Sequence, residues 1–542
     1  MIFSKSMILP LSSMVALALV VSACGETTSQ QAPDKVQKEQ VKATEMQPVK
    51  LACSAESLDA LPDVRITSTT SENNPVPLCK VTGVIGTETN FELLLPDDWN
   101  GKFVMGGGGG FVGSVINTAL GYGVLHNGYA TVGTDTGHRG NPIDASWALN
   151  NLERVVSFGH QAVHRTAVTA KALIANYYGV DISRSLFFGC SRGGGQALME
   201  AQRYPEDFDG IVAGAPAYNW TVELGGRNTW INQVMYPNPD DLSAATITPK
   251  IQHFLGNAVM QQCDSLDGIE DGILSNPMDC VLNLDEFACR GEVSDNCLDS
   301  TQIEALSRIY KGLVIDGEPV FPGYPPGGKV GEGGWTRWFT GGLEIDVDSE
   351  FQAGVTSDPE FPDPVTPNAH FAFGNGVMKY LVFHDPDWDY STYDFSTFYS
   401  DVAAVSATLD ATDPDLGAFR ERGGKLLMFN GWRDMALSPY GTIQYFEQVL
   451  EKDASAADDV RLIMVPGMDH CIGGPGPSWI NWVDEIDQWL ETGQAPNQLT
   501  TYWINEQMQP EGSRLACAYP SVLMYDGTGD TRDSSSFRCM DD

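Results

Sequence analysis

Basic residues are scarce in this sequence. The 542 residues contain 32 lysines and arginines against 71 aspartates and glutamates, so the formal net charge is -39. A surface of this sign repels the phosphates of nucleic acids and of anionic lipid headgroups. The charge balance therefore argues against nucleic acid as a partner and against docking on a membrane through a basic face. It predicts a solvated acidic surface.

Long apolar runs are also lacking, and no internal repeat is evident. The run at residues 7–21 is too short and ends too abruptly for a membrane span, and Lys5 precedes it, as in a secretory signal. It ends in VSAC, which resembles the bacterial lipobox, whose cysteine (here Cys24) becomes the lipidated first residue. We therefore expect residues 1–24 to be a lipoprotein-type signal peptide, and the protein to be a lipoprotein of the bacterial cell envelope, in the outer membrane or periplasm. A secreted protein cut nearby is the alternative.

Aromatic residues are missing from residues 25–48, which are polar and predict a flexible tether. Cysteine, by contrast, is plentiful: there are eleven, and in exported proteins cysteines usually pair. If Cys24 carries lipid, an even number remains, which permits five disulfides without a free thiol. The other cysteines are Cys53, Cys79, Cys190, Cys263, Cys280, Cys289, Cys297, Cys471, Cys517 and Cys539.

The succession of strand and helix patterns predicts an α/β fold. Strand patterns within residues 81–105 precede a helix pattern at residues 157–179, and strands alternate with helices again near the C-terminus. Such alternation implies a mainly parallel sheet covered on both faces. Residues 218–404 differ, because they are rich in Pro, Gly, Trp and Asp and have weak periodicity. We expect this segment to be an inserted domain, with residues 49–217 and 405–542 forming the two parts of the α/β domain.

The stretch GCSRG at residues 189–193 fits the nucleophile elbow, in which a serine stands on a sharp turn between a strand and a helix. The letters SLFF before it favour a strand. The letters GGGQALMEAQR after Arg192 favour a helix, and the positive N-terminal end of its dipole then points at Ser191. Ser191 is therefore the predicted nucleophile. Cys190, directly before it, is a rival only as a free thiol, which the even cysteine count argues against.

A base and an acid should follow the serine, in the order Ser, Asp or Glu, His. Of the four later histidines, only His470 stands in a turn directly after a clear strand pattern, VRLIMV. Asp434 follows the strand pattern KLLMFNGW in the same manner, and open α/β sheets gather their sites at the carboxyl ends of strands. We predict that His470 relays the proton and that Asp434 orients the imidazole. Asp469 is a rival acid by adjacency, but a neighbour in sequence usually points away.

Five glycines at residues 106–110 follow an early strand pattern, where a hydrolase of this kind places donors for the oxyanion. We expect the donors to be the backbone N–H groups of Gly108 or Gly109 and of Arg192, the residue after the nucleophile. A flexible loop without this role is the alternative. A phosphate-binding loop does not fit, because no Lys-Ser/Thr follows.

Together these residues resemble the tannase and feruloyl esterase family, which includes bacterial mono(2-hydroxyethyl) terephthalate hydrolases. The matching segments are GCSRGGG, FNGWRDMALSP, PGMDHCIGGPG, WNGKFVMGGGGGF and GTDTGH, and the resemblance spans residues 51–539. It implies an α/β-hydrolase fold with a large lid domain, residues 218–404, inserted between the strand after the nucleophile elbow and the acid-bearing strand. The disulfide pairs that it implies are Cys190–Cys471, Cys53–Cys79, Cys263–Cys280, Cys289–Cys297 and Cys517–Cys539.

The segment CDSLDGIEDGILSNPMDC at residues 263–280 is acidic and has two glycines for tight turns. Its spacing is not that of an EF-hand, and by itself it predicts a solvated acidic turn. The family resemblance implies instead a structural Ca²⁺ site that braces the lid, since calcium takes carboxylate and carbonyl oxygens. The implied ligands are Asp264, Asp267 and Asp271 with the carbonyls of Ile269 and Ile273. We expect no cofactor for catalysis.

The leading hypothesis is a serine carboxylic ester hydrolase for small esters of aromatic acids, of the hydroxycinnamic, gallic or terephthalic type. The inserted segment is rich in aromatic residues that either line a pocket for a ring or pack as core, and Arg337 or Lys379 is a candidate to bind an acyl carboxylate. The aromatic candidates are Trp335, Trp338, Phe339, Phe373, Tyr380, Phe383 and Trp388. The alternatives are a serine peptidase on the same fold and a non-catalytic surface lipoprotein. We expect a monomer.

Overall fold

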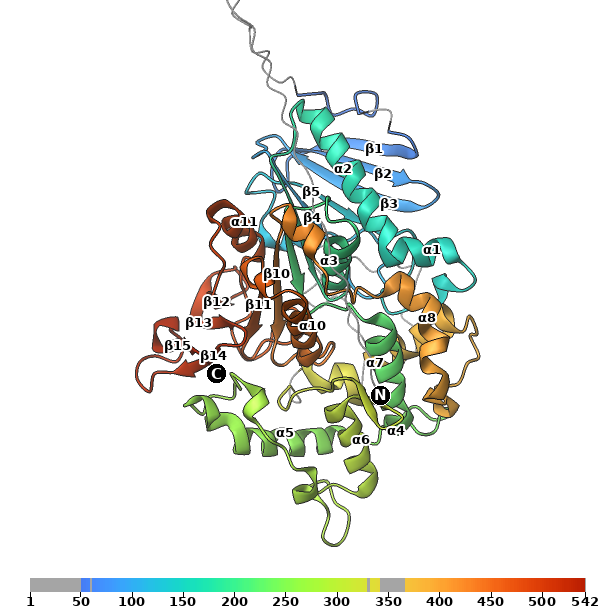
Figure 1. Ribbon diagram of the computed structural model, residues 1–542, viewed down its shortest axis with the longest axis vertical. Coiled ribbons are helices and arrows are strands. Elements are labelled where there is room, and N and C mark those ends of the chain that lie inside the picture. Colours follow the sequence, from blue (N-terminus) through green and yellow to red (C-terminus); the bar gives the residue numbers. More distant parts are fainter. Residues whose placement is uncertain (1–49, 59–60, 329–331, 342–365, 542) are drawn as a thin grey trace, which may run out of the picture. The chain divides into compact units, whose positions relative to one another are not determined.

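The computed structural model describes residues 50–58, 61–328, 332–341 and 366–541 (Figure 1). The expected signal peptide with Cys24 and the expected tether lie outside the described residues. Within the described residues, no helix combines the length and the apolar character that crossing a membrane requires.

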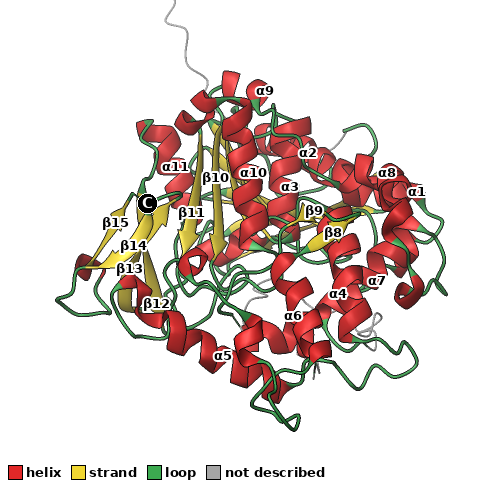
Figure 2. Ribbon diagram, turned by 60° about the horizontal axis from the view of Figure 1, so that its bottom comes forward, coloured by secondary structure: helices red, strands yellow, loops and turns green. Residues whose placement is uncertain are grey.

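A sheet of eleven strands, in the order β1-β2-β3-β5-β4-β6-β7-β10-β11-β13-β12, forms the core of the α/β part. Figure 2 shows its neighbouring strands β10 and β11 with the helices α10 and α11 beside them. The strands from β5 through β11 in this order run parallel, and the strands at either end are antiparallel. The predicted mainly parallel centre is therefore confirmed. The strands are β1 (Val64–Glu72), β2 (Leu78–Ile85), β3 (Thr89–Pro96), β4 (Lys102–Gly106), β5 (Ala130–Thr134), β6 (Arg184–Cys190), β7 (Gly210–Gly214), β10 (Lys425–Gly431), β11 (Val460–Val465), β12 (Gln498–Ile504) and β13 (Pro510–Ala518).

Helices cover both faces of this sheet. Successive side chains of a strand point in opposite directions, so a single strand contributes to the apolar contacts on both faces. In β10, Leu426 and Met428 join an apolar cluster that contains side chains of α2, α3 and α10. Leu427 and Phe429, in alternation, join a second cluster that contains side chains of α11. Burial on both faces is typical of a parallel strand in an α/β protein. These helices are α2 (Ala162–Tyr178), α3 (Arg192–Arg203), α10 (Pro439–Lys452) and α11 (Trp482–Thr492). The short helix α1 (Leu152–Val156) joins a different apolar cluster through its buried Val155.

The strands β7 and β10 are neighbours in the sheet, yet about 210 residues separate them in sequence, by the bounds just given (green to orange in Figure 1). The described part of this insertion is mostly helical, and its residues Trp220, Trp335 and Phe339 join an apolar cluster that also contains Phe111 and Phe158 of the α/β part. The expected boundary at residue 404 falls inside α8. The elements are α4 (Asn228–Met235), α5 (Pro249–Cys263), α6 (Ser300–Lys311), β8 (Leu313–Ile315), β9 (Glu318–Phe321), α7 (Ala369–Gly376), α8 (Phe398–Leu409) and α9 (Gly417–Glu421).

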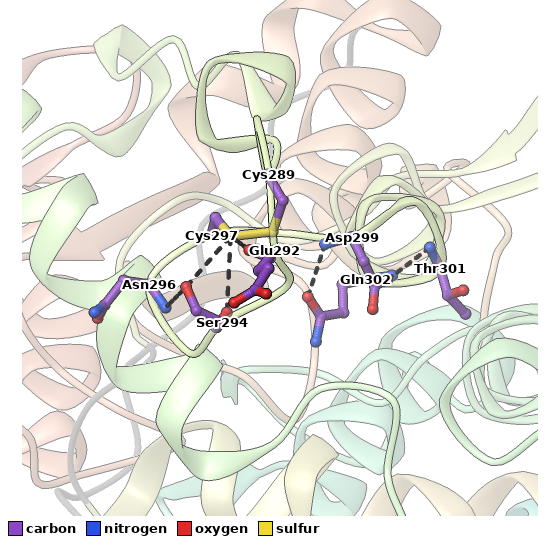
Figure 3. Close-up of a disulfide and its surroundings, with 8 residues drawn as sticks. All are labelled: Cys289, Glu292, Ser294, Asn296, Cys297, Asp299, Thr301 and Gln302. Atoms are coloured by element: carbon purple, nitrogen blue, oxygen red, sulfur yellow. Dashed lines mark hydrogen bonds between the residues drawn. A yellow bond between two sulfur atoms is a disulfide. The ribbon is translucent and has the colours of Figure 1, made fainter.

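Five disulfides connect the ten described cysteines, in the pairs that the family resemblance implies. Cys517–Cys539 joins β13 to β15 (Phe537–Met540), which pairs with β14 (Val522–Tyr525) in a small C-terminal sheet. Cys289–Cys297 closes an exposed loop just before α6, and Figure 3 shows the start of that helix beside it. There the Asp299 carboxylate accepts hydrogen bonds from the N–H groups of Thr301 and Gln302. A set of five disulfides is typical of an exported protein.

Candidate active site

Ser191 stands between the end of β6 and the start of α3, as the nucleophile elbow requires. Its backbone angles are φ 62° and ψ -123°, in a region that residues with a side chain rarely adopt. So sharp a turn requires the strand before it and the helix after it to approach very closely. A Cβ atom on Gly189 would lie 2.3 Å from the carbonyl oxygen of Gly193, so no larger residue fits there. The glycines of the motif thus serve close packing around a strained serine.

His470 and Asp434 lie in loops after the neighbouring parallel strands β11 and β10. Nδ1 of His470 lies 2.8 Å from Oδ2 of Asp434. The other oxygen of this fully buried carboxylate accepts hydrogen bonds from the N–H groups of Ala436 and Leu437, at 2.8 and 3.0 Å. The backbone of the loop thus fixes the acid in the orientation that meets the imidazole. The structure brings together the predicted base and the predicted acid.

Asp469, the rival acid, turns away from His470. Its carboxylate lies 3.5 Å from Nε of Arg433, and no hydrogen bond joins it to the His470 ring among the described residues. Burial, opposed by the charge of Arg433, raises the pKa of Asp469 to about 6. This residue therefore belongs to the support of the loop rather than to the imidazole.

A disulfide ties the serine turn to the histidine loop. Cys190 and Cys471, the residues directly before Ser191 and directly after His470, are bonded, with their Cα atoms 5.9 Å apart. Both cysteines are buried. A thiol beside the predicted nucleophile is thus not a second nucleophile, because its sulfur is consumed in a bond that holds the two loops together.

The glycine loop after β4 offers fewer donors than the sequence suggests. The N–H group of Gly107 donates to the carbonyl of Phe188, and the N–H group of Gly108 donates to Oε1 of Gln196 at 3.0 Å. A Cβ atom on Gly109 would meet no atom within 4 Å, so this residue faces open space. Arg192 begins α3, where the first N–H groups have no partner within the helix. Gly109 and Arg192 therefore remain as the candidate oxyanion donors, and Gln196 is a contact that the motif did not reveal.

A buried ion pair from the inserted segment supports the loop that carries Asp434. Oε1 of Glu223 accepts a hydrogen bond from the N–H group of Ser438 at 2.9 Å and lies 3.3 Å from the Arg227 guanidinium. Burial raises the pKa of Glu223 to about 7, although Arg227 opposes the shift. Sequence reasoning missed this pair, because Glu and Arg at i,i+4 usually form an exposed helix-surface pair. Its only signal was its position among the apolar letters of NWTVELGGR.

The aromatic candidates of the insertion differ in whether they contact the ring of His470. Trp338 lies edge-on to the His470 ring, with centroids 5.5 Å apart, and Arg337 stacks over Trp338. Trp335 and Phe339 are core neighbours of each other, and Phe373 contacts Phe111 after the glycine loop. The remaining candidates Phe383 and Trp388 stack on one another with Tyr393, without a ring contact to His470, while Tyr380 and Lys379 are half-buried.

The acidic loop after α5 contains oxygen atoms suitable for a calcium ion. Repulsion from Asp271 contributes, after burial, to the raised pKa of both Asp264 and Asp267, so the three carboxylates are near one another. Each also accepts hydrogen bonds from N–H groups of its own loop. Arg514 lies 2.6 Å from Asp271 and neutralises part of the charge. Oxygen donors of this kind are the ones that Ca²⁺ prefers, but the three carboxylates do not converge here: their ligand atoms do not all lie within 4.8 Å of one another. The predicted carbonyls, of Ile269 and Ile273, belong to the same loop.

A family model described as tannase and feruloyl esterase matches residues 77–540. The chain belongs to the tannase and feruloyl esterase family. Mono(2-hydroxyethyl) terephthalate hydrolase of Piscinibacter sakaiensis is 29% identical over 509 residues, which cover 85% of this chain and 83% of that relative. Feruloyl esterase B of Aspergillus niger is 28% identical over 490 residues, which cover 86% of this chain and 87% of that relative.

The fold is shared with solved esterases of the family. The crystal structure of feruloyl esterase B from Aspergillus oryzae matches with a TM-score of 0.75 at 26% identity, over 90% of this chain and 98% of that chain. Both proteins have a mixed α/β fold with a large central sheet. The protein is therefore a carboxylic ester hydrolase of this family, as the sequence predicted.

Proposed function

We propose that this esterase cleaves small esters of aromatic acids through an acyl-enzyme formed on Ser191. The observation that carries the proposal is the His470–Asp434 hydrogen bond, in a loop that the Cys190–Cys471 disulfide ties to the serine turn. A nucleophile, a base and an acid that orients the base are what hydrolysis by this route requires. A surface-binding protein without catalysis would have no use for this arrangement.

In the proposed mechanism, the Ser191 hydroxyl attacks the ester carbonyl while Nε2 of His470 takes its proton. Asp434 keeps Nδ1 of His470 protonated, so that Nε2 is the basic nitrogen, and stabilises the imidazolium that forms. The N–H groups of Gly109 and Arg192 donate to the oxyanion. His470 then protonates the leaving alcohol, and a water molecule releases the acid by the same steps.

We assign the choice of substrate to the inserted segment, acting as a lid. Trp338 supports this, because it places an aromatic surface against the ring of His470. An aromatic acyl group stacked there gains contact that an acetyl group does not make. Arg337, stacked on the same tryptophan, is the candidate to bind a free carboxylate on the acyl ring. The relatives named for feruloyl and terephthalate esters support the same substrate class.

We also assign Ca²⁺ to the loop at Asp264, Asp267 and Asp271, with the carbonyls of Ile269 and Ile273 as further ligands. Bound there, the ion would relieve the repulsion among the carboxylates and brace the insertion, and it would supply no chemistry to the ester. Chelation should therefore lower the melting temperature more than it lowers the initial rate at low temperature.

The sequence features at the N-terminus lead us to assign the chain to the bacterial cell envelope, with Cys24 as the lipidated residue. Its five disulfides agree with export. Labelling of expressing cells with an alkyne-tagged fatty acid tests this, with Cys24→Ala as the control that should lose the label.

A panel of substrates tests the proposed activity. Purified enzyme is assayed with methyl ferulate, methyl gallate, chlorogenate and mono(2-hydroxyethyl) terephthalate, beside p-nitrophenyl acetate and peptide substrates. We expect one or more aromatic esters to exceed the acetate in kcat/KM and no peptide to be cleaved. Cleavage of peptides but of no ester would show a peptidase instead.

A further inference from the structure

A second cluster of ionisable side chains lies along the helix that begins at the serine turn. It consists of His164 on α2, Glu200 in the last turn of α3, and Asp207 in the loop before β7. One nitrogen or oxygen atom from each residue lies within 4.8 Å of the atoms from the other two. Glu200 follows Ser191 by nine residues, about 13 Å along a helix, so the cluster is separate from the hydrolytic residues.

Glu200 is the member that requires a partner. Its side chain is 0% exposed, and no N–H or hydroxyl group of the described residues donates to either carboxylate oxygen; its hydrogen-bonding neighbour is another carboxyl group, that of Asp207. An ionised carboxylate in such a place is costly without a compensating charge. Burial, and then the charge of the neighbouring Asp207 carboxylate and a hydrogen bond shared with it, hold the pKa of Glu200 well above its usual range. The position therefore needs either a proton or a cation.

The other charged groups around Glu200 are already engaged. Asp207 lies 2.6 Å from Nδ1 of His164, and the ammonium of Lys171 donates to the main-chain carbonyl of Asp207. Lys171 balances one of the two carboxylates, so the cluster retains a negative charge when both are ionised. Tyr204 stacks on the His164 ring, with centroids 3.9 Å apart and planes 7° apart, and so fixes the plane of the imidazole.

We propose that His164, Glu200 and Asp207 bind one divalent transition-metal ion of the Zn²⁺ type. An imidazole nitrogen with two carboxylates is a donor set that Zn²⁺ accepts, at about 2.0–2.2 Å from each atom. Tetrahedral ligand atoms at that distance are about 3.3 Å apart, within the spread of this cluster. The ion replaces the proton between His164 and Asp207 and gives the Glu200 oxygens a partner.

The location supports a stabilising role for the ion. His164 is the exposed member, with 33% of its side chain accessible, so the ion reaches the site from solvent and a water molecule completes its coordination. Its ligands come from three separate segments of the chain, which are α2, α3 and the loop before β7. Binding therefore braces the helix behind the serine turn without contacting the substrate.

Isothermal titration of the untagged, metal-free full chain with Zn²⁺ tests the proposal, in saturating Ca²⁺ so that the loop at Asp264 does not compete. We expect one equivalent to bind with release of one or two protons, measured by repeating the titration in buffers of different ionisation heat. The melting temperature should rise by about 3–5 °C at a hundredfold excess over the dissociation constant. Ester hydrolysis should stay within about twofold of its metal-free rate, since the site is remote from the chemistry.

Two variants and a control make the test specific. Glu200→Gln keeps the shape of the side chain, and His164→Phe keeps the stacking on Tyr204, and each should weaken Zn²⁺ at least tenfold. His126→Gln removes an exposed histidine elsewhere and should bind as the wild type does. The proposal is wrong if the wild type binds no Zn²⁺. It is also wrong if Glu200→Gln and His164→Phe both melt cooperatively, which shows that they are folded, and both bind Zn²⁺ as tightly as the wild type. Absence of binding together with a more stable Glu200→Gln protein would show that a proton is the partner of Glu200.

Discussion

The sheet and the inserted segment supply different kinds of neighbour to His470. From the sheet come Asp434, through a hydrogen bond of 2.8 Å, and Cys471, whose disulfide reaches the serine turn. From the insertion comes Trp338, whose ring lies across the imidazole at 78°, with the ring centroids 5.5 Å apart. The sheet thus holds the reacting groups through directional bonds, while the insertion contributes an apolar surface. Changes in the sheet loops should therefore affect every ester alike, whereas changes in the insertion should alter the preference among esters.

The sharpest test of this division is removal of the nucleophile. Ser191→Ala should lower kcat by about 10⁵–10⁶-fold on every ester of the panel, since the whole covalent route is lost. The thermal melt should remain cooperative, because alanine removes only one hydroxyl group from a half-buried residue. Unchanged hydrolysis in this variant would remove Ser191 from the mechanism.

The two acids near His470 allow a matched pair of substitutions. Asp434→Asn should lower kcat by about 10⁴-fold, because an amide in contact with Nδ1 favours the wrong tautomer. Asp469→Asn changes a carboxylate next in sequence but without a hydrogen bond to the ring, and should cost less than tenfold. Equal losses in the two variants would contradict the assignment of Asp434.

One disulfide of the sheet loops and one of the insertion can be compared, because the first closes a long loop and the second a short one. Cys190→Ala with Cys471→Ala opens a bridge across 281 residues and, on the chain-entropy model, should lower the free energy of unfolding by about 5.6 kcal/mol. Activity should fall as well, because the serine turn and the histidine loop lose their link. Cys289→Ala with Cys297→Ala opens a bridge across 8 residues, should cost about 2.5 kcal/mol and should leave kcat/KM unchanged. Urea unfolding and kcat/KM measure both; a fully active first double variant would show that the link is not needed for catalysis.

Trp338→Ala tests the contribution of the insertion. The variant should lower kcat/KM for the preferred aromatic ester by about 10–100-fold, mainly through KM, since a ring surface in contact with the acyl group is lost. Hydrolysis of p-nitrophenyl acetate should change less than threefold. Trp388→Ala is the control, because that tryptophan stacks on Phe383 and not on His470. Equal losses on acetate and aromatic esters would make Trp338 part of the chemistry instead of the selection.

The sequence was most informative where a strand ends in a functional loop. Ser191, Asp434 and His470 could each be predicted because a buried strand pattern breaks off shortly before them, and the structure places each residue in the loop or turn that follows its strand. The insertion has no such periodicity, so its aromatic residues could be named but not assigned to a contact. Gln196 and Glu223 were not found, since their roles depend on which loop lies beside their helix.

Glu223 gives the prediction with the smallest expected effect. It belongs to the insertion, but it accepts a hydrogen bond from the loop of the sheet that carries Asp434. Its raised pKa, about 7, means that the folded protein binds a proton that the unfolded chain releases near the usual glutamate value. This group therefore stabilises the fold at low pH and loses that contribution as pH rises towards and through 7. Glu223→Gln should flatten the fall in melting temperature between about pH 5 and 8, and should also remove a step in the pH profile of kcat, because Glu223 accepts from the Ser438 N–H in the loop of Asp434. A variant with unchanged pH dependence would show that Glu223 keeps its charge throughout, balanced by the neighbouring Arg227.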